Sequence, residues 1–260
     1  MMKLKIISFN IKNNFSRSQN EQKRLNELVS FLRQENADIV GLQEVNSYAK
    51  KIITEALMEY QVIGKSRFNR DNKWNEYNLL LFKKERVEVI EERTVWLHHE
   101  VNEKYVRFGV LPRICTYATF LIDKKESVVV FNTHLDVLSA SIRKKQLTAI
   151  IKQIKALDPS LPLLGMGDFN LSFTTHNKDF LKRLMEEYDC DLTPIYETYP
   201  VKVLTRDSWW RRKGYPIDYF LLSSHWKITY FSLSNDEVGK GRLSDHLPLI
   251  CELEKTGHIT

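Results

Sequence analysis

A carboxylate and a carboxamide stand two residues apart at the end of a short apolar run. The run Pro162–Met166 predicts a buried strand, and Asp168 and Asn170 follow it. Alternation along a strand places these two side chains on one face, while Phe169 between them turns toward the core. Gly167 has no side chain, so backbone or a ligand can come close. The pattern indicates a binding or catalytic site at a strand end, although an Asx turn that closes the strand would use the same residues.

Two earlier segments also end in polar side chains. Lys3–Asn10 alternates polar and apolar residues and ends in a carboxamide, and Asp38–Glu44 ends in a carboxylate. Between them, Ser18 begins a capping box that is followed by leucines at helical spacing. A strand, a helix and a strand within about forty residues favour a right-handed crossover and a parallel strand pair. We therefore expect Asn10 and Glu44 to lie side by side at one edge of a sheet.

The same order of elements recurs in the second half of the chain. The β-branched segment Ser127–His134 ends in a histidine, and an apolar stripe from Ile142 to Leu157 predicts a helix before the strand that carries Asp168. Further strands are expected at Glu76–Phe82, Val87–Leu97, Ile114–Ile122, Tyr215–Leu222 and Leu247–Cys251. So many strands with flanking helices predict an α/β fold, a four-layer sandwich of two packed mixed β-sheets flanked by helices.

The composition is that of a globular chain with ample core material. Of 260 residues, 43% are hydrophobic and 28% charged, and no linker or low-complexity tract divides the sequence, so we expect one domain over residues 1–260. No apolar run approaches the ~18 residues of a membrane helix. Three cysteines form no disulfide framework and, without an export signal, indicate a cytoplasmic protein. The formal charge of +6 mildly favours a polyanionic partner.

Six short motifs share a feature: each places polar residues at or beside the end of an expected strand. They are Ser8–Asn10, Gln43–Glu44, Thr133–His134, Gly167–Asn170, Ile217–Tyr219 and Ser244–His246. Together, and in this order, they resemble the motifs of the endonuclease/exonuclease/phosphatase superfamily. That metal-dependent fold is shared by pancreatic deoxyribonuclease, abasic-site endonucleases, poly(A) deadenylases, neutral sphingomyelinases and inositol polyphosphate 5-phosphatases. The resemblance covers almost the whole chain.

The resemblance implies a divalent metal ion held by Asn10, Glu44 and Asp245. Their oxygen donors suit a hard cation, Mg²⁺ or Mn²⁺, and suit zinc poorly. Taken alone, Glu44 would instead be interpreted as a solvated carboxylate that follows a strand, since most glutamates are exposed.

The resemblance also implies which groups act on a phosphoester. Asp168 resembles the group that orients and deprotonates the attacking water, and Asn170 resembles the residue that steadies it. His246 resembles the histidine that binds the scissile phosphate, and Asp218 resembles the carboxylate that fixes its tautomer. A histidine beside an aspartate is more often a capping or surface residue, and only the shared register with Asp218 argues against that interpretation of His246.

His134 indicates a branch of the family. The resemblance implies a histidine at this position in the deoxyribonuclease, sphingomyelinase and phosphatase branches, and a tyrosine in the abasic-site endonucleases. Glu76 resembles the carboxylate that partners this histidine in deoxyribonuclease-like enzymes. Arg113 resembles a family arginine near the phosphate, and its alternative role is a charge at a strand edge. The implied mechanism is in-line attack of water on phosphorus, without a covalent nucleophile.

Two segments that interleave aromatic and cationic residues are candidate substrate loops. One runs from Ser66 to Trp74, and the other from Asp207 to Gly214 with Trp209–Lys213 at its centre. Aromatic rings that stack on bases and cations that meet phosphates make nucleic acid a plausible partner. The same residues would also suit an inositol phosphate or a lipid head group, or a solvated surface loop.

Three functions are consistent with these features. The first is a metal-dependent phosphodiesterase or nuclease, of endonuclease or exonuclease type. The second is a phosphatase or phosphodiesterase that acts on a small phosphorylated molecule or a lipid head group, although Leu171 stands where inositol phosphatases of the family place an arginine. The third is a catalytically inactive binding module, which the intact motifs disfavour. Hydrolysis of a phosphoester is therefore the predicted activity.

Overall fold

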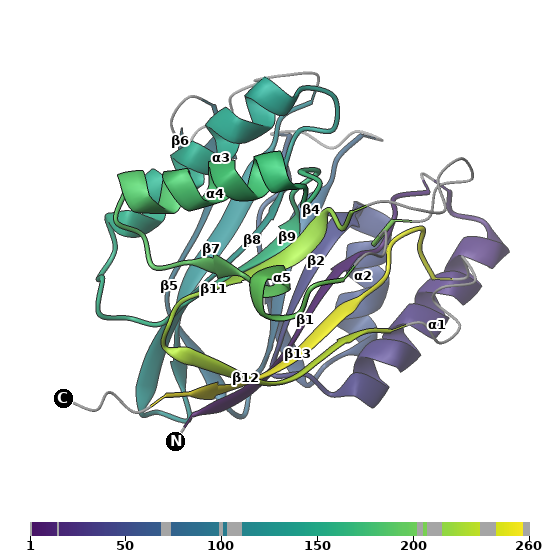
Figure 1. Ribbon diagram of the computed structural model, residues 1–260. Coiled ribbons are helices and arrows are strands. Elements are labelled where there is room, and N and C mark those ends of the chain that lie inside the picture. The colour runs from purple at the N-terminus through teal and green to yellow at the C-terminus, as the bar shows by residue number, and fades with distance from the viewer. Residues whose placement is uncertain are drawn as a thin grey trace.

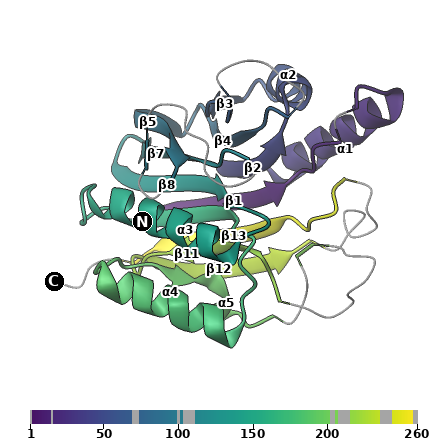
Figure 2. The same ribbon diagram turned by 90° about the horizontal axis from the view of Figure 1, so that it is seen from above.

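The computed structural model describes residues 2–14, 16–68, 74–98, 101–102, 111–201, 205–206, 215–234 and 243–256. Within them, two mixed β-sheets face each other and helices cover their outer faces, as Figure 1 and Figure 2 show from two directions. This arrangement confirms the predicted four-layer α/β sandwich. In this part of the chain, no helix is both long enough and apolar enough to cross a membrane.

Each sheet carries its own helices. The first sheet has the order β12 (Trp226–Leu233), β13 (Leu249–Lys255), β1 (Lys3–Asn10), β2 (Ile39–Val45), β4 (Tyr77–Lys83) and β3 (Tyr60–Ile63). The second has the order β10 (Thr193–Pro194), β11 (Asp218–Leu222), β9 (Leu163–Asp168), β8 (Glu126–His134), β7 (Ile114–Ile122), β5 (Val87–Leu97) and β6 (Val101–Asn102). Helices α1 (Gln19–Glu35) and α2 (Ser47–Ala56) pack on the first sheet, and α3 (Ala140–Lys155), α4 (Thr175–Glu187) and α5 (Ile195–Thr198) accompany the second.

Two apolar clusters hold these layers together. The larger fills the space between the sheets and continues under α3 and α4. Within it, Phe82 of the first sheet meets Phe120 of the second with ring centroids 4.8 Å apart. The smaller cluster joins the first sheet to α1 and α2, and there Phe9 packs edge-on against Phe31. Because the central strands are buried on both faces, their sequences are nearly continuous apolar runs that end in polar residues only at the sheet edge.

The two predicted parallel strand pairs are present. In the first, β1 pairs with β2 and Asn10 lies opposite Gln43. In the second, β8 pairs with β9 and His134 lies opposite Asp168. Within each sheet the carboxyl ends of the parallel strands coincide, and the packing of the two sheets brings both ends together, so that Asn10 contacts Asp168.

Helix α1 begins where the sequence predicts. Ser18 is its N-cap, and its Oγ accepts a hydrogen bond from the backbone N–H of Glu21 at 3.3 Å. The reciprocal half of the capping box is absent, because the Glu21 carboxylate instead accepts hydrogen bonds from Arg24 and Asn14. Leucines at helical spacing form the buried face of this helix. The cap is therefore confirmed, although Glu21 has a different partner from the one that the motif predicts.

Gly167 allows the close approach that the sequence indicates. Its φ is +150°, and a Cβ at this position would lie 2.0 Å from the backbone carbonyl oxygen of Thr133 on the neighbouring strand β8. A backbone atom cannot yield as the tip of a flexible side chain can. Gly167 therefore lets β8 and β9 bring His134 and Asp168 to the same edge.

Gly167→Ala is expected to destabilise the fold by about 3 kcal/mol, since it adds both an unfavourable φ and a backbone clash. Urea unfolding of the wild type and of Gly167→Ala measures this difference in the free energy of unfolding. Gly41→Ala is the control, because its Cβ would meet the flexible side chain of Met166 at Sδ, 2.3 Å away, and so should cost less. A Gly167→Ala variant that is as stable as Gly41→Ala would contradict this account.

Several elements differ from those expected. The strand predicted at Glu76–Phe82 spans Tyr77–Lys83, and the last strand begins at Leu249 and continues to Lys255. The sequence analysis also missed β3, α2, α4 and β12. Strand β12 lies at a sheet edge with most of its residues partly or fully exposed, so it lacks the apolar signal of a core strand. Helix α2 buries only Ala49 and Ile53, which is too few for a clear periodic pattern.

Candidate active site

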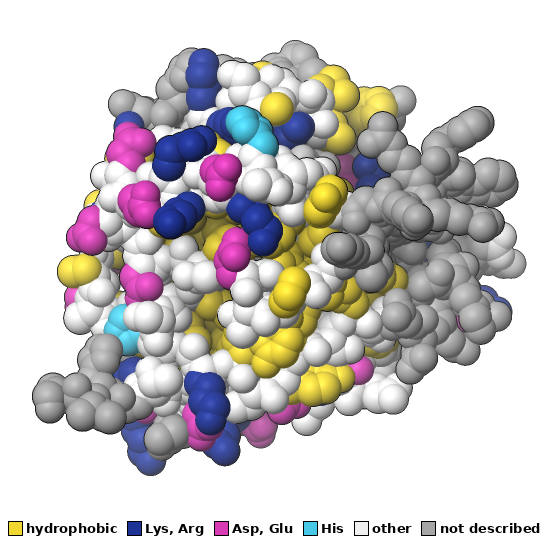
Figure 3. Space-filling view, in the orientation of Figure 1, with side chains coloured by type: hydrophobic (Ala, Val, Ile, Leu, Met, Phe, Trp, Pro, Cys, Tyr) yellow, Lys and Arg dark blue, Asp and Glu magenta, His cyan; other side chains and the backbone are white. Residues whose placement is uncertain are grey.

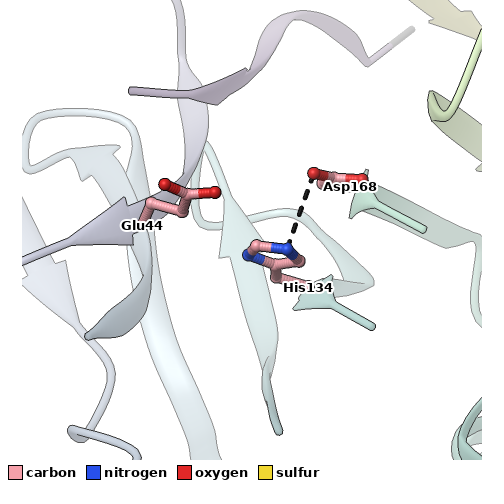
Figure 4. Close-up of side chains that lie close together, drawn as sticks. All are labelled: Glu44, His134 and Asp168. Carbon is pink, nitrogen blue, oxygen red and sulfur yellow. Dashed lines mark ion pairs between the residues drawn. The ribbon is translucent and has the colours of Figure 1, made fainter. Parts of the chain in front are cut away.

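Asp168 lies at the centre of a buried polar cluster at the end of β9. Its Oδ2 accepts a hydrogen bond from Asn10 Nδ2 at 3.0 Å, and its Oδ1 accepts one from the backbone N–H of Asn170 at 2.9 Å. The Nε2 atoms of His134 and His246 lie 3.6 Å and 3.7 Å from Oδ2. Figure 4 shows the His134 ring between the carboxylates of Glu44 and Asp168. Residues from both sheets thus converge on one oxygen atom.

The surroundings of Asp168 raise the pKa of its carboxyl group toward neutral pH. Burial, followed by the charge of Asp218 opposite it on β11, raises the pKa of Asp168 to about 7 from the ordinary 3.8, against the opposing effect of His246. A carboxylate with a pKa near the working pH is suited to general-base chemistry. Asp168 is therefore a candidate general base.

Asp218 and His246 form the predicted carboxylate–imidazole pair. His246 Nδ1 lies 2.9 Å from Asp218 Oδ2, and Thr205 Oγ1 also donates to that oxygen. The backbone N–H of His246 donates to Ser244 Oγ at 3.1 Å, which fixes the segment that carries the ring. Burial alone would lower the pKa of His246, but the charge and hydrogen bond of Asp218, with Asp168, raise it to about 9. The imidazole is therefore cationic at neutral pH and directs Nε2 toward Asp168.

His134 has the opposite character. Burial, and then the positive charges of Arg113, Arg67 and His246, hold the pKa of His134 well below its usual range, so the ring is neutral. Its Nδ1 is buried and has no hydrogen-bond partner among the described residues. The site thus holds one cationic and one neutral imidazole near a single carboxylate oxygen. Pairs of groups whose pKa values are driven apart in this way are typical of acid–base sites.

The expected contact between Glu76 and His134 is wrong. Glu76 Oε2 forms an ion pair with Arg67 Nη1 at 2.7 Å, and Glu76 Oε1 accepts a hydrogen bond from Asn13 Nδ2 at 3.2 Å. A guanidinium is a stronger partner for a carboxylate than a neutral imidazole is, and Arg67 is buried beside it. Glu76 therefore belongs to the neighbourhood of the site but does not orient His134.

Asn10 and Glu44 lie side by side, as the sequence predicts. Asn10 Nδ2 donates to Glu44 Oε1 at 3.0 Å as well as to Asp168. Glu44, His134 and Asp168 offer ligand atoms that all lie within 4.8 Å of one another. The oxygens of the two carboxylates in this group suit a hard divalent cation. The amide of Asn10 would have to rotate to present its oxygen to that cation.

Two residues in the site adopt left-handed backbone conformations. Glu44 has φ 57° and Asn170 has φ 48°, and neither is a glycine. Such conformations cost energy and persist where the surroundings demand them, often at functional sites. Asn170 steadies Asp168 through its backbone N–H, while its carboxamide donates to the carbonyl of Leu135 at 3.1 Å.

Asp245 faces cations. Its Oδ2 lies 3.5 Å from Arg206 Nε and 4.0 Å from Lys12 Nζ. Within the described part of the chain, it is not among the clustered carboxylates and histidines that could share an ion. The predicted ligands therefore divide into Asn10 and Glu44, which are in contact, and Asp245, whose role as a ligand stays a prediction.

The candidate substrate loops are described only in part. Trp74 is 48% exposed, and its backbone carbonyl accepts hydrogen bonds from Arg67. Residues 69–73 and 207–214, which include Trp209–Lys213, lie outside the described residues. On the face that Figure 3 shows, Lys and Arg side chains lie next to Asp and Glu side chains over α4, so α4 offers no uniformly basic surface.

Four polar residues hold the site in place, of which the sequence indicated only Arg67, as part of a candidate substrate loop rather than as a partner of Glu76. Asn13 and Arg67 contact Glu76, Thr205 contacts Asp218, and Asn132 donates from β8 to the carbonyls of Leu42 and Leu79 on the facing sheet. Of the three that sequence analysis missed, only Asn132 left a signal, since it is a polar residue in a run that is otherwise apolar. The others lie in loops, where polar residues are common.

In the metal-free protein, stability is expected to fall as the pH rises from 6 to 9. Asp168 and His246 have folded-state pKa values of about 7 and about 9, above their ordinary values of 3.8 and 6.5. A raised folded pKa contributes stability that is present at low pH and lost as the pH rises through that pKa. Because a divalent cation favours the ionised carboxylate, the gain in Tm on adding Mg²⁺ should be larger at pH 8.5 than at pH 6. Calorimetry of chelator-treated protein measures both effects.

Asp168→Asn provides the control for this pH dependence. The amide cannot ionise, so the Tm of the variant should rise relative to the wild type between pH 5 and pH 7, where Asp168 is protonated in the folded but not in the unfolded wild-type protein, and the difference should level off above this range. A constant difference in Tm across this range would contradict the proposed origin of the effect.

Comparison with known proteins places this site in a family. The chain matches the Endonuclease/Exonuclease/phosphatase family over residues 7–246. No curated protein matches it in a sequence search. Among solved structures, a Bacteroides vulgatus endonuclease/exonuclease/phosphatase is similar with a TM-score of 0.85 and 25% identity, covering 98% of this chain and 100% of that one.

Two further structures show the same fold. The Bacteroides thetaiotaomicron mannosyl-6-phosphatase matches with a TM-score of 0.80 and 21% identity, over 96% of this chain and 99% of that one. D. rerio TDP2 in complex with a single-strand DNA product matches with a TM-score of 0.75 and 17% identity, over 97% and 99%. With the family match spanning Ile7 to His246, the chain belongs to the Endonuclease/Exonuclease/phosphatase family.

Proposed function

We propose that this protein is a Mg²⁺- or Mn²⁺-dependent phosphoester hydrolase in which Asp168 activates water. The observation that carries the proposal is the position of Asp168 beside one cationic and one neutral imidazole, with Nε2 atoms 3.6 Å and 3.7 Å from one carboxylate oxygen. Membership of a family of phosphoester hydrolases supports it. A buried carboxylate with a pKa near 7 can take a proton from water and return it within each cycle.

Each residue near Asp168 has a role in this proposal. His246, held by Asp218, donates from Nε2 to a phosphate oxygen as negative charge develops there. Neutral His134 provides a further hydrogen bond to the phosphate, and the backbone of Asn170 keeps Asp168 oriented toward the water. Asn10, Glu44 and Asp245 would hold the divalent ion, which when bound offsets charge on the phosphate.

Arg113 supplies a site for the anionic substrate. The residue is 5% exposed, and its Nε is buried without a hydrogen-bond partner among the described residues. Its charge acts strongly enough on His134 to be the second cause of the lowered pKa of that ring. A buried donor with no partner is costly, and an oxygen of a phosphoester beside His134 would satisfy it.

A phosphodiester in nucleic acid is the proposed substrate class. The exposed ring of Trp74, next to the buried Arg67, would stack on a base, and a similar fold in D. rerio TDP2 was solved with a single-strand DNA product. A small phosphomonoester is the alternative, because a mannosyl-6-phosphatase has the same fold.

A substrate panel tests the proposal. It contains plasmid DNA, single-stranded DNA, RNA, abasic DNA, bis-p-nitrophenyl phosphate, p-nitrophenyl phosphate, inositol phosphates and a hexose 6-phosphate, each with Mg²⁺ or with excess chelator. We expect cleavage of the diesters that stops when chelator is added. Turnover of monoesters alone would replace the nuclease assignment by the phosphatase one. Turnover that survives chelator would remove the metal, and no turnover of any substrate would overturn the proposal.

A further inference from the structure

Arg67 is a buried arginine to which the proposed reaction assigns no role. It follows β3, is 3% exposed, and its Nη1 lies 2.7 Å from Glu76 Oε2. Its Nε and Nη2 donate to the carbonyl of Trp74 at 2.9 Å and 2.6 Å. Its own backbone N–H donates to the carbonyl of Glu76 at 2.9 Å. Each of the three guanidinium nitrogens thus has an acceptor within the protein.

The ion pair connects to Glu44 through one residue. Glu76 Oε1 accepts from Asn13 Nδ2 at 3.2 Å, and the backbone N–H of Asn13 donates to Glu44 Oε2 at 3.0 Å. The other side of the Asn13 amide is also fixed, since its Oδ1 accepts from Asn46 Nδ2 at 2.8 Å. Glu44 Oε2 is therefore held at the end of a continuous chain of contacts that starts at Arg67.

We propose that Arg67 and Glu76 are positioning residues for the cation site, acting through Asn13 on Glu44. This inference rests on the proposed function, because it assigns the ion pair to the metal that Glu44 would bind. Partners that orient a metal ligand commonly change metal affinity by 10–100-fold. Glu44 needs such support, since its backbone has φ 57° and, among the described residues, its other oxygen accepts a hydrogen bond from the side chain of Asn10 alone.

Stability alone is a weak reason for this ion pair. A buried pair gains little over apolar side chains of similar volume, because both charges lose their hydration. Removing one partner, however, leaves an unpaired buried charge. A single substitution would therefore mix a loss of stability with any loss of metal-ligand positioning. The double variant Arg67→Met/Glu76→Leu separates the two effects, because it removes both charges together and also removes the acceptor for Asn13.

Cation affinity of the full chain tests the inference. Mn²⁺ binding is measured by electron paramagnetic resonance and Mg²⁺ binding by calorimetry, with Tm recorded for each protein. We expect Arg67→Met/Glu76→Leu to bind either ion 10–100-fold more weakly while its Tm recovers above that of Arg67→Met. Asn13→Ala, which keeps the backbone donor but loses the link to Glu76, should weaken binding too. When Asn13→Ala is added to the double variant, the further loss of cation affinity should be smaller than the loss that Asn13→Ala causes alone, because the three residues act through one series of contacts.

Arg86→Met is the matched control. Arg86 Nη1 pairs with the buried Asp38 Oδ1 at the same distance of 2.7 Å, but Asp38 precedes β2 and lies at the opposite end of that strand from Glu44. This variant should lose stability and keep cation affinity. If both the double variant and Asn13→Ala kept a cation affinity within twofold of wild type, this inference would be overturned and the proposed function would stand. A wild-type protein that binds neither ion would overturn the metal assignment, and the inference with it.

Discussion

Asp168→Asn is expected to lower kcat by about 10³-fold or more while leaving the fold intact. The amide has nearly the same size and can still accept the hydrogen bond from the backbone N–H of Asn170, but it cannot take a proton from water. Because the substrate phosphate would contact Arg113 and the histidines, KM should change much less than kcat. Steady-state kinetics on whichever diester the panel identifies measures both constants.

Asp189→Asn serves as the control for this substitution. Its carboxylate is 98% exposed and pairs with Lys155, the last residue of α3. This variant should retain wild-type kinetics. If Asp168→Asn kept a kcat within tenfold of the wild type, Asp168 would not be the group that activates water.

His246→Gln is expected to lower kcat by about 10²–10⁴-fold, since it removes a cationic donor that is already charged at neutral pH. Asp218→Asn should lower kcat as well, because the carboxylate both orients Nδ1 and keeps the pKa of His246 raised. Removing that carboxylate lowers the pKa of His246, so the fall in activity at alkaline pH should shift to lower pH. A pH–rate profile of Asp218→Asn measures this shift.

The double variant completes this test. If Asp218 acts only through His246, Asp218→Asn in the His246→Gln background should cost little more than His246→Gln alone. His225→Gln is the control, since His225 is also buried but lies beside Ser223, near the opposite end of β11 from Asp218. Fully additive losses in the double variant would show that the two residues act independently.

The amino-acid sequence by itself determined the architecture and the identity of the central residues. Apolar runs that end in polar residues located the strands β1, β2, β8 and β9, and the helical spacing between them predicted the parallel pairs. Once each pair forms, Asn10 lies beside Glu44 and His134 lies beside Asp168, because the carboxyl ends of parallel strands coincide. The order of the elements therefore predicts each half of the site without coordinates, whereas the packing of the two sheets brings the halves together.

Only the tertiary structure decided which partner each charged group takes. Glu76 has Arg67 rather than His134 as its partner, and Asp245 faces Arg206 and Lys12. The strength of such contacts changes steeply over a few ångströms, and the competing groups come from loops whose paths are not set by periodic patterns. The raised pKa of Asp168 arises in the same way, from burial and from Asp218 on a strand fifty residues later in the chain. The order of the elements places each pair of polar side chains at a strand end, and the packing of the two sheets brings the pairs together and selects their contacts.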